Sequence, residues 1–197
     1  MTTIEAIDAW EVLDSRGNPT VRTRVHTADG SGTFTVPAGA STGSHEAVES
    51  RDGGDRFDGL GVTEAVEAVN DELAATAVGR DVTRQASIDA ALVDTDGTEN
   101  LSRLGANAVL SVSGAVARAA ADARDEPVYA SLAPDEPGAI PRPMVNILSG
   151  GLHAHGGVEI QDFLVVPMGA DTYSEAIETV WAVRRAVRDR IEDRGVR

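Results

Sequence analysis

The stretch Thr20-Val-Arg-Thr-Arg-Val-His-Thr27 decides the first part of the fold. Val21, Thr23 and Val25 share one side of an extended chain, and the two arginines and the histidine between them share the other. Successive side chains of a strand point to opposite faces, so this alternation predicts a strand with one buried face and one solvated face.

Signals on both sides extend this strand into a small sheet. Residues 4–13 mix apolar and acidic side chains and predict an earlier strand, which ends in the turn formers of residues 14–19. Ala28-Asp29-Gly30 is a hairpin signal, and residues 32–36 return as a further strand. We therefore predict a three-stranded meander at the start of the chain.

Helical periodicity replaces strand periodicity after the meander. Apolar residues recur at helical spacing across residues 62–73 and again across residues 83–93, where Ile88 and Leu92 would face inward. Residues 94–100 are rich in turn formers and predict a break between helices. A sheet followed by packed helices is the expected architecture of this part of the chain.

Residues 104–121 are predicted to form the central helix, because their small side chains allow close packing on all sides. Asn107 within them either satisfies backbone groups or caps a helix, and we favour a structural role. The proline-rich passage at residues 125–143 follows and is a candidate domain boundary.

The last part of the chain predicts two short strands and a helix. Residues 144–148 and 160–167 have strand character and are joined by a turn of glycine and histidine. Thr172-Tyr-Ser-Glu175 is a capping box, which marks a helix start. The apolar residues expected to face inward on this helix are Ile177, Val180, Val183, Val187 and Ile191.

Composition excludes several classes of protein. The net charge of −15 argues against nucleic-acid binding, because phosphates repel an acidic surface. There is no cysteine, which excludes disulfides, thiol catalysis and thiolate metal sites. The N-terminus has no long apolar run, so we expect no signal peptide. The most apolar stretch, residues 106–123, holds Arg118 and Asp122 and predicts a buried helix rather than a membrane span, so we expect a cytoplasmic location.

The basic residues are unusual, since all 17 are arginine and none is lysine. An acidic excess with lysine depleted is typical of a surface adapted to high salt, where screening weakens self-repulsion. The codon bias of a GC-rich genome gives the same depletion, and both explanations stay open.

The loop Val36-Pro-Ala-Gly-Ala-Ser-Thr-Gly43 is the first candidate site. Its small side chains let the backbone approach a ligand closely, and its glycines can take positive φ. Ser41 and Thr42 add hydroxyls suited to a metal ion or a phosphate. The alternative is an ordinary mobile surface connection.

The second candidate site is the glycine-rich stretch at residues 150–157, which contains His153 and His155 and is followed by Gln161 and Asp162. A glycine frame permits a loop that folds over an anion, whereas the His-x-His spacing is only weak evidence for a metal. The alternatives are a solvated glycine turn for the histidines and a strand-end charge for Asp162.

Five motifs in order resemble the enolase family, the phosphopyruvate hydratases of glycolysis. Together they cover essentially the whole chain, and as a set they are highly specific. They are Asp14-Ser-Arg-Gly-Asn-Pro-Thr20, the loop at residues 36–43 with His45-Glu46-Ala47, Asp96-Gly-Thr-Glu-Asn100, Leu104-Gly-Ala-Asn-Ala108, and Asn146-Ile-Leu-Ser-Gly-Gly-Leu-His-Ala154 leading to Gln161-Asp-Phe163. The resemblance implies an α+β N-terminal cap domain over residues 1–133, followed by the start of a TIM-like α/β barrel over residues 134–197.

The resemblance also implies roles for individual residues. Ser41 is expected to bind Mg²⁺ as its loop closes, with Ala40 and Ser41 beside the substrate. His153 is expected at the phosphate and leaving-group side, and Gln161 at the substrate. Asp162 stands where the family usually has Glu, near the leaving hydroxyl, and its side chain reaches ~1.5 Å less far. A second departure is Ser149, where the family usually has Asn.

The implied reaction is the dehydration of 2-phosphoglycerate to phosphoenolpyruvate, with Mg²⁺ stabilising the dianionic intermediate. In the family, the principal Mg²⁺ carboxylates, the acid Glu and the catalytic Lys lie on later barrel strands. Since this chain has no lysine, we expect a truncated form that is inactive alone. The full-length family implies a homo-oligomer.

Two alternatives remain. One is another enolase-superfamily member acting on acid sugars, although the loop at Ser41 belongs to enolases proper. The other is a non-catalytic dimerisation or binding fragment. It would keep the meander and the region of Arg16, which resembles the family's subunit interface.

Overall fold

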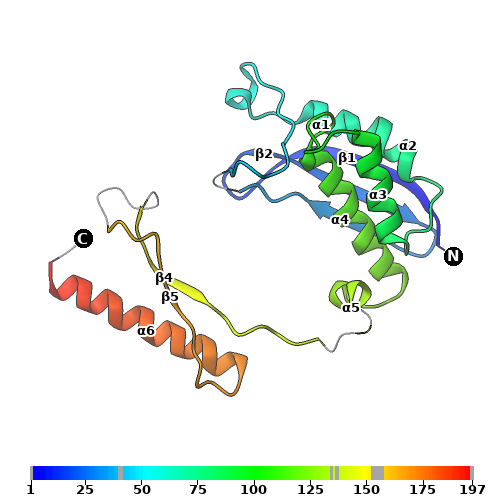
Figure 1. The fold of residues 1–197 in the computed structure, drawn as a ribbon. Helices are drawn as coiled ribbons and strands as arrows, with labels where there is room; N and C mark the ends of the chain where they lie inside the picture. Colours follow the sequence, from blue (N-terminus) through cyan, green and yellow to red (C-terminus); the bar gives the residue numbers. More distant parts are fainter. Residues whose placement is uncertain (1, 40–41, 134, 136–137, 152–157, 196–197) are drawn as a thin grey trace. The chain divides into compact units, whose positions relative to one another are not determined.

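The computed structural model describes residues 2–39, 42–133, 135, 138–151 and 158–195. The chain forms two compact units, Met1–Glu136 and Pro137–Arg197, which we call unit 1 and unit 2. Unit 1 combines an antiparallel sheet with helices, and unit 2 combines a strand pair with a long helix (Figure 1). Within the described ranges, no helix is both long and apolar enough to cross a membrane.

The meander predicted from the sequence is confirmed. Its antiparallel strands, in the order β1-β2-β3, are β1 (Ile4–Leu13), β2 (Pro19–Thr27) and β3 (Ser31–Thr35). Val21, Thr23 and Val25 are fully buried, as their alternation with exposed arginines requires. The turn between β2 and β3 is closed by the Thr27 N–H, which donates to the Gly30 carbonyl at 2.9 Å.

Helices cover the sheet of unit 1, and α4 packs directly on β2 and β3 (Figure 1). The helices are the 3₁₀ turn η1 (Arg56–Gly59), α1 (Thr63–Ala68), the π segment η2 (Val69–Leu73), α2 (Ala74–Ala77), α3 (Gln85–Asp96), α4 (Ala106–Ala123) and α5 (Val128–Leu132). Helix α5 begins after Pro127, inside the proline-rich passage, where we predicted no helix. A proline just before a helix loses no hydrogen bond, because the first N–H groups have no partner within the helix.

The predicted helix across residues 62–73 is interrupted by the π segment η2. Asn70 lies in this segment, and its side chain accepts from the Ala9 N–H at 2.8 Å and donates to the Ala9 carbonyl at 3.3 Å. Because β1 is an edge strand of the sheet, Asn70 pairs backbone groups that no neighbouring strand reaches. Helical spacing in the sequence gives no sign of this contact.

Helix α3 extends to Asp96, into the stretch that we expected to be a turn-rich break. Gly97 then ends the helix with φ of 72°, a left-handed conformation that favours glycine. The Asp96 side chain is buried and accepts hydrogen bonds from the Leu104 N–H at 2.7 Å and the Thr98 N–H at 3.0 Å. The turn after α3 is therefore organised around a buried carboxylate.

Helix α4 is the central helix of unit 1, as predicted. It is not packed on all sides, however, because Leu110 is 46% exposed. Its backbone lies against β3. A Cβ placed on Gly32 would come within 2.2 Å of the Ala115 carbonyl oxygen and of the Ala119 nitrogen. Only a residue without a side chain fits at this contact.

Unit 2 begins with two strands that pair antiparallel, β4 (Val145–Ser149) and β5 (Asp162–Val165), followed by α6 (Tyr173–Asp193). Both predicted strands are present, although β5 begins two residues later than expected. The capping box is confirmed. Thr172 Oγ1 accepts from the Glu175 N–H at 3.2 Å, and the Glu175 carboxylate accepts from the Thr172 N–H at 3.2 Å.

The inward face of α6 differs from the prediction at one residue. Ile177 is 42% exposed, whereas Ala176 and Val180 are buried. Consecutive helical residues are 100° apart, so the stripe through Ala176 and Val180 turns Ile177 toward the face of Tyr173 and Trp181, which are both exposed. The remaining predicted inward residues, Val183, Val187 and Ile191, are half-buried.

Candidate functional site

The predicted site residues fall in both units. Ala40, Ser41 and His153 lie outside the described residues. Gln161 and Asp162 stand at the start of β5 in unit 2. The structure does describe both flanks of the Ser41 loop, residues 36–39 and 42–48, and shows how each is attached to unit 1.

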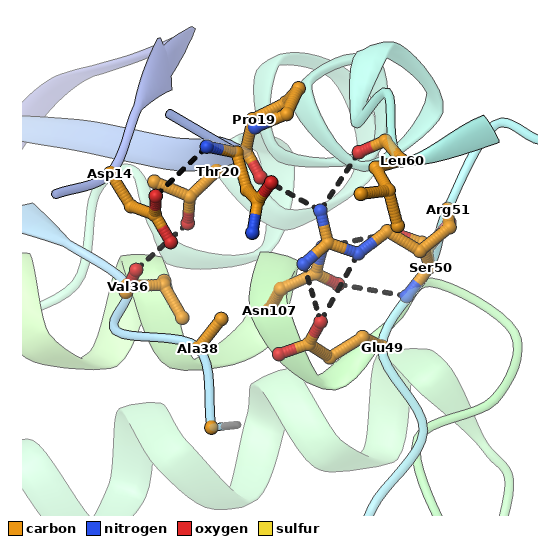
Figure 2. A network of polar contacts seen from close by, with 12 residues as sticks. Asp14, Pro19, Thr20, Val36, Ala38, Glu49, Ser50, Arg51, Leu60 and Asn107 are labelled. Atoms are coloured by element: carbon orange, nitrogen blue, oxygen red, sulfur yellow. Dashed lines mark hydrogen bonds and ion pairs between the residues drawn. The ribbon is translucent and has the colours of Figure 1, made fainter. Parts of the chain in front are cut away.

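The first flank is held by two side chains from the β1–β2 region. The Thr20 hydroxyl donates to the Val36 carbonyl at 2.8 Å (Figure 2). Arg16 Nη2 donates to the Ala38 carbonyl at 2.8 Å and to the Gly39 carbonyl at 3.2 Å. The backbone is thus tied to the sheet until two residues before Ser41.

Asp14 holds Arg16 in place. Its Oδ1 accepts from the Arg16 N–H at 2.8 Å and from the Asn18 N–H at 2.9 Å, and its Oδ2 lies 3.6 Å from Arg16 Nε. The hydrogen bond from Asn18 is the main cause that keeps the pKa of Asp14 below its ordinary value. The N–H and the charge of Arg16 lower this pKa further, against the opposing effect of burial. Asp14 is therefore ionised at neutral pH and fixes the turn that carries Arg16.

The second flank is held by α4. Asn107, which is 2% exposed, accepts from the Ser50 N–H at 3.0 Å and donates to the Ser50 carbonyl at 3.0 Å (Figure 2). The Val48 N–H donates to the Asn100 carbonyl at 2.9 Å, and the Val48 carbonyl accepts from the Ala106 N–H at 2.8 Å. The structural role predicted for Asn107 is confirmed.

Arg51 extends this second attachment. Its Nη1 donates to the Pro19 carbonyl at 2.7 Å and to the Leu60 carbonyl at 2.8 Å, and its Nη2 lies 2.6 Å from the Glu49 carboxylate (Figure 2). The planar guanidinium can satisfy three acceptors at once, which a lysine ammonium does less well. Arg51 therefore joins the end of the loop to the start of β2.

A cavity of about 450 Å³ lies between the two flanks and α4. Pro37 borders it from the first flank, Glu46 and Arg51 from the second, and Leu110 from α4. This volume is in the range of small-molecule sites, which combine apolar walls with a few polar groups. The attached loop therefore borders a space of ligand size.

We expect Asn107→Ala to destabilise unit 1 by ~2 kcal/mol, because both Ser50 backbone groups lose their buried partner. The matched control is Asn100→Ala at an exposed position, which should change stability by less than ~0.5 kcal/mol. Urea unfolding followed by Trp10 fluorescence in a Trp181→Phe background reports on unit 1. Equal stabilities of the two variants would contradict the anchoring role.

In unit 2, a side chain from β4 holds the Asp162 carboxylate. Asn146 Nδ2 lies 2.6 Å from Asp162 Oδ1 and 2.7 Å from Ser149 Oγ. The antiparallel register places Ser149 opposite Asp162, so both side chains lie within reach of the Asn146 amide. The Gly150 N–H donates to the Gln161 carbonyl at 2.7 Å, which extends the pairing of β4 and β5 by one residue toward the loop that connects them.

In the part of the chain that the structure describes, no three histidine, aspartate or glutamate side chains gather as a potential metal site. The Mg²⁺ that the resemblance implies therefore has no complete set of ligands among these residues. A hydroxyl such as that of Ser41 would supply one oxygen, whereas Mg²⁺ prefers octahedral oxygen coordination.

Comparison with known proteins matches both units to one family. Residues 4–132 match the family described as "Enolase, N-terminal domain", and residues 138–196 match "Enolase, C-terminal TIM barrel domain". The chain belongs to the enolase family. It is 52% identical over 195 residues to the enolase of Acidothermus cellulolyticus (strain ATCC 43068 / DSM 8971 / 11B), covering 96% of this chain and 46% of that protein. The chain thus spans about half the length of this enolase.

The fold expected from the enolase resemblance is present, an N-terminal domain with a three-stranded antiparallel sheet plus helices, followed by the start of the barrel domain. Sequence reasoning missed the contacts that Arg16, Arg51 and Asn146 make. Arg16 and Asn146 lie inside the motifs that resemble the enolase family, but the sequence indicated no contact for either side chain. Because the partner of Arg51 at Pro19 is 32 residues away, no local pattern could reveal it.

Proposed function

We propose that this chain is the N-terminal, loop-bearing part of an enolase that dehydrates 2-phosphoglycerate to phosphoenolpyruvate in glycolysis. The observation that carries the proposal is the family match across both units, together with a Gly-Ala-Ser-Thr-Gly loop attached on both sides to the sheet and α4. The loop belongs to unit 1, and the hairpin with Asp162 belongs to the start of the barrel.

We assign the site residues as follows. Ser41 binds Mg²⁺, and Ala40 and Ser41 contact the substrate. His153 acts at the phosphate and leaving-group side, and Gln161 contacts the substrate. Asp162 acts near the leaving hydroxyl, and Asn146 supports this assignment because it orients the carboxylate at 2.6 Å.

The cofactor of the whole enzyme is Mg²⁺ under this proposal, and its charge would stabilise the dianionic intermediate when bound. The base comes from outside this chain, since the family's base is a lysine and the sequence has none. The residues present here supply the loop, its attachments and the first barrel side chains. A cytoplasmic homo-oligomer adapted to high salt is the form that we propose for the enzyme.

The test uses the purified 197-residue chain and a fusion of it to the remaining barrel sequence of the Acidothermus enolase. We expect no Mg²⁺-dependent formation of phosphoenolpyruvate from the chain alone, and clear turnover from the fusion. In the fusion, Asp162→Asn should lower kcat by ~100-fold or more, as for the loss of a general acid or base.

Turnover by the isolated chain would overturn the proposed inactivity. A fusion that unfolds cooperatively but does not turn over 2-phosphoglycerate would overturn the proposed substrate, and activity on acid sugars would identify the other superfamily member. The Asp162→Asn variant is the control that links activity to this chain.

The second candidate is a non-catalytic dimerisation or binding fragment. The exposed apolar residues of α6, among them Tyr173 and Trp181, favour association of the isolated chain. Arg16, however, hydrogen-bonds its own Ala38 and Gly39, which requires no second subunit. Size-exclusion chromatography with a Mg²⁺ titration separates the two candidates, because dimerisation without metal binding supports the fragment.

A further inference from the structure

A β-bulge in β4 brings three polar side chains to one face of the strand pair in unit 2. The register with β5 shifts between Asn146 and Leu148, which leaves Ile147 as an extra residue. In a regular strand, Asn146 and Ser149 would point to opposite faces, because they are three residues apart. The bulge cancels one step of this alternation, so both side chains share the face of Asp162, the register partner of Ser149.

The Asn146 amide joins the members of this cluster through both its nitrogen and its oxygen. Its Nδ2 donates to Asp162 Oδ1 at 2.6 Å and to Ser149 Oγ at 2.7 Å. Its Oδ1 accepts from the Leu148 N–H at 3.2 Å, just beyond the bulge. A carboxylate can only accept hydrogen bonds, so the amide has to turn its nitrogen toward Asp162. One side chain therefore holds the bulge, the serine hydroxyl and the carboxylate together.

The hydrogen-bonding capacity that remains on Ser149 and Asp162 is complementary. Because Ser149 Oγ accepts from Asn146, the hydroxyl hydrogen of Ser149 is available to another acceptor. Within the contacts of the described residues, that hydrogen and Asp162 Oδ2 are both unpaired, and both side chains are exposed. A ligand hydroxyl satisfies both groups, since it accepts from the serine and donates to the carboxylate. A ligand carboxylate has no hydrogen to donate and is repelled by Asp162.

We propose that Ser149 is a specificity-determining residue that donates a hydrogen bond to the leaving hydroxyl of the substrate, while Asp162 accepts one from it. The inference rests on the proposed function, in which Asp162 acts near this hydroxyl. It adds Ser149 as a direct contact and Asn146 as the positioning residue that sets the separation of the two oxygens. Because 2-phosphoglycerate carries the hydroxyl and phosphoenolpyruvate does not, the pair distinguishes substrate from product.

The first test measures the alignment by NMR in the 197-residue chain. The two Nδ2 hydrogens of Asn146 give separate signals, and each signal reports the acceptor that its hydrogen faces. We expect Ser149→Ala to shift one signal upfield and Asp162→Ala to shift the other, because each variant removes one acceptor. The matched control is Ser174→Ala, an exposed serine of α6, which should move neither signal. Unmoved Asn146 signals in Ser149→Ala would overturn the alignment, whether or not the fusion is active.

The second test measures hydroxyl recognition in the fusion enzyme. Ser149→Ala should raise the KM for 2-phosphoglycerate by ~10-fold, which corresponds to the loss of about one hydrogen bond. The inhibition constant of phosphoenolpyruvate should stay unchanged, because this ligand lacks the hydroxyl. Ser149→Thr keeps a hydroxyl and should restore the wild-type KM, and Ser174→Ala should match the wild type.

The two ligands separate hydroxyl recognition from a structural role of Ser149. Weaker binding of both ligands by the same factor would overturn hydroxyl recognition, because a disturbed site affects substrate and product alike. An unchanged KM in Ser149→Ala would overturn it as well. A wild-type fusion that folds but shows no turnover would overturn the proposed function, whereas the Asn146 signals of the 197-residue chain would still decide the alignment.

Discussion

Replacing Gly32 with Val should destabilise unit 1 by ~3 kcal/mol or more and leave the chain largely unfolded in that unit. A Cβ at this position would come within 2.2 Å of two backbone atoms of α4, the Ala115 carbonyl oxygen and the Ala119 nitrogen. Backbone atoms of a helix cannot move aside singly. Relief therefore requires α4 to separate from β3, which would open the core that they share.

Thr33→Val is the matched control for this variant. It places the same valine at the next residue of β3, on the opposite face, where it removes only the exposed hydrogen bond from Arg24 Nε to the Thr33 hydroxyl, and it should change stability by less than ~0.5 kcal/mol. Far-ultraviolet circular dichroism and urea unfolding followed by Trp10 fluorescence, in the Trp181→Phe background, measure both. A Gly32→Val protein as stable as the control would show that α4 does not rest on β3 as described.

The second large effect is expected at Asp96. Asp96→Ala should cost ~3 kcal/mol, because the Leu104 N–H, the Thr98 N–H and the Thr98 hydroxyl all lose a buried charged acceptor. Arg103 also donates to the backbone carbonyls of Thr95 and Asp96, so the Asp96 carboxylate and the Arg103 guanidinium together hold the turn after α3. The exposed neighbour Asp94 provides the control, since Asp94→Ala should change stability by less than ~0.5 kcal/mol.

Asp96 also predicts a pH dependence. Burial opposes its ionisation, but the hydrogen bonds from Thr98 and Leu104 outweigh burial and hold the pKa of Asp96 below its ordinary value of 3.8. A carboxylate with a lowered folded pKa stabilises the protein above its unfolded pKa and loses that effect as the pH falls through the folded value. Wild-type stability should therefore fall as the pH drops below about 4, and Asp96→Ala should lack this contribution.

Unfolding curves at pH 7, pH 5 and pH 3 measure this difference. The difference in the free energy of unfolding between wild type and Asp96→Ala should narrow at the lowest pH, because the Asp96 carboxyl of the unfolded chain then begins to bind a proton that the folded carboxylate binds less readily. A gap of constant size across this range would contradict a lowered pKa at Asp96. Asp94→Ala should track the wild type throughout.

The sequence predicted the residues of the candidate site but not the hydrogen bonds that hold its loop in place. The loop at residues 36–43 was recognised from its small residues, and the start of β5 from strand character and a family motif. The tether from Arg16 to Ala38 spans 22 residues, and the clamp of Asn107 on Ser50 spans 57. Such contacts join segments whose local patterns carry no information about each other.

The sequence was sufficient to predict local structure and to identify the family. Strict alternation set the meander, a capping box set the start of α6, and ordered motifs identified the enolase family. These signals act over a few residues, where backbone geometry dictates which side chains share a face. Three features became clear only in the folded chain: Gly32 lies against α4, Asn70 pairs with the edge strand β1, and Ile177 faces solvent. Each depends on where a distant element packs, and packing is set by the whole chain rather than by any one stretch of it.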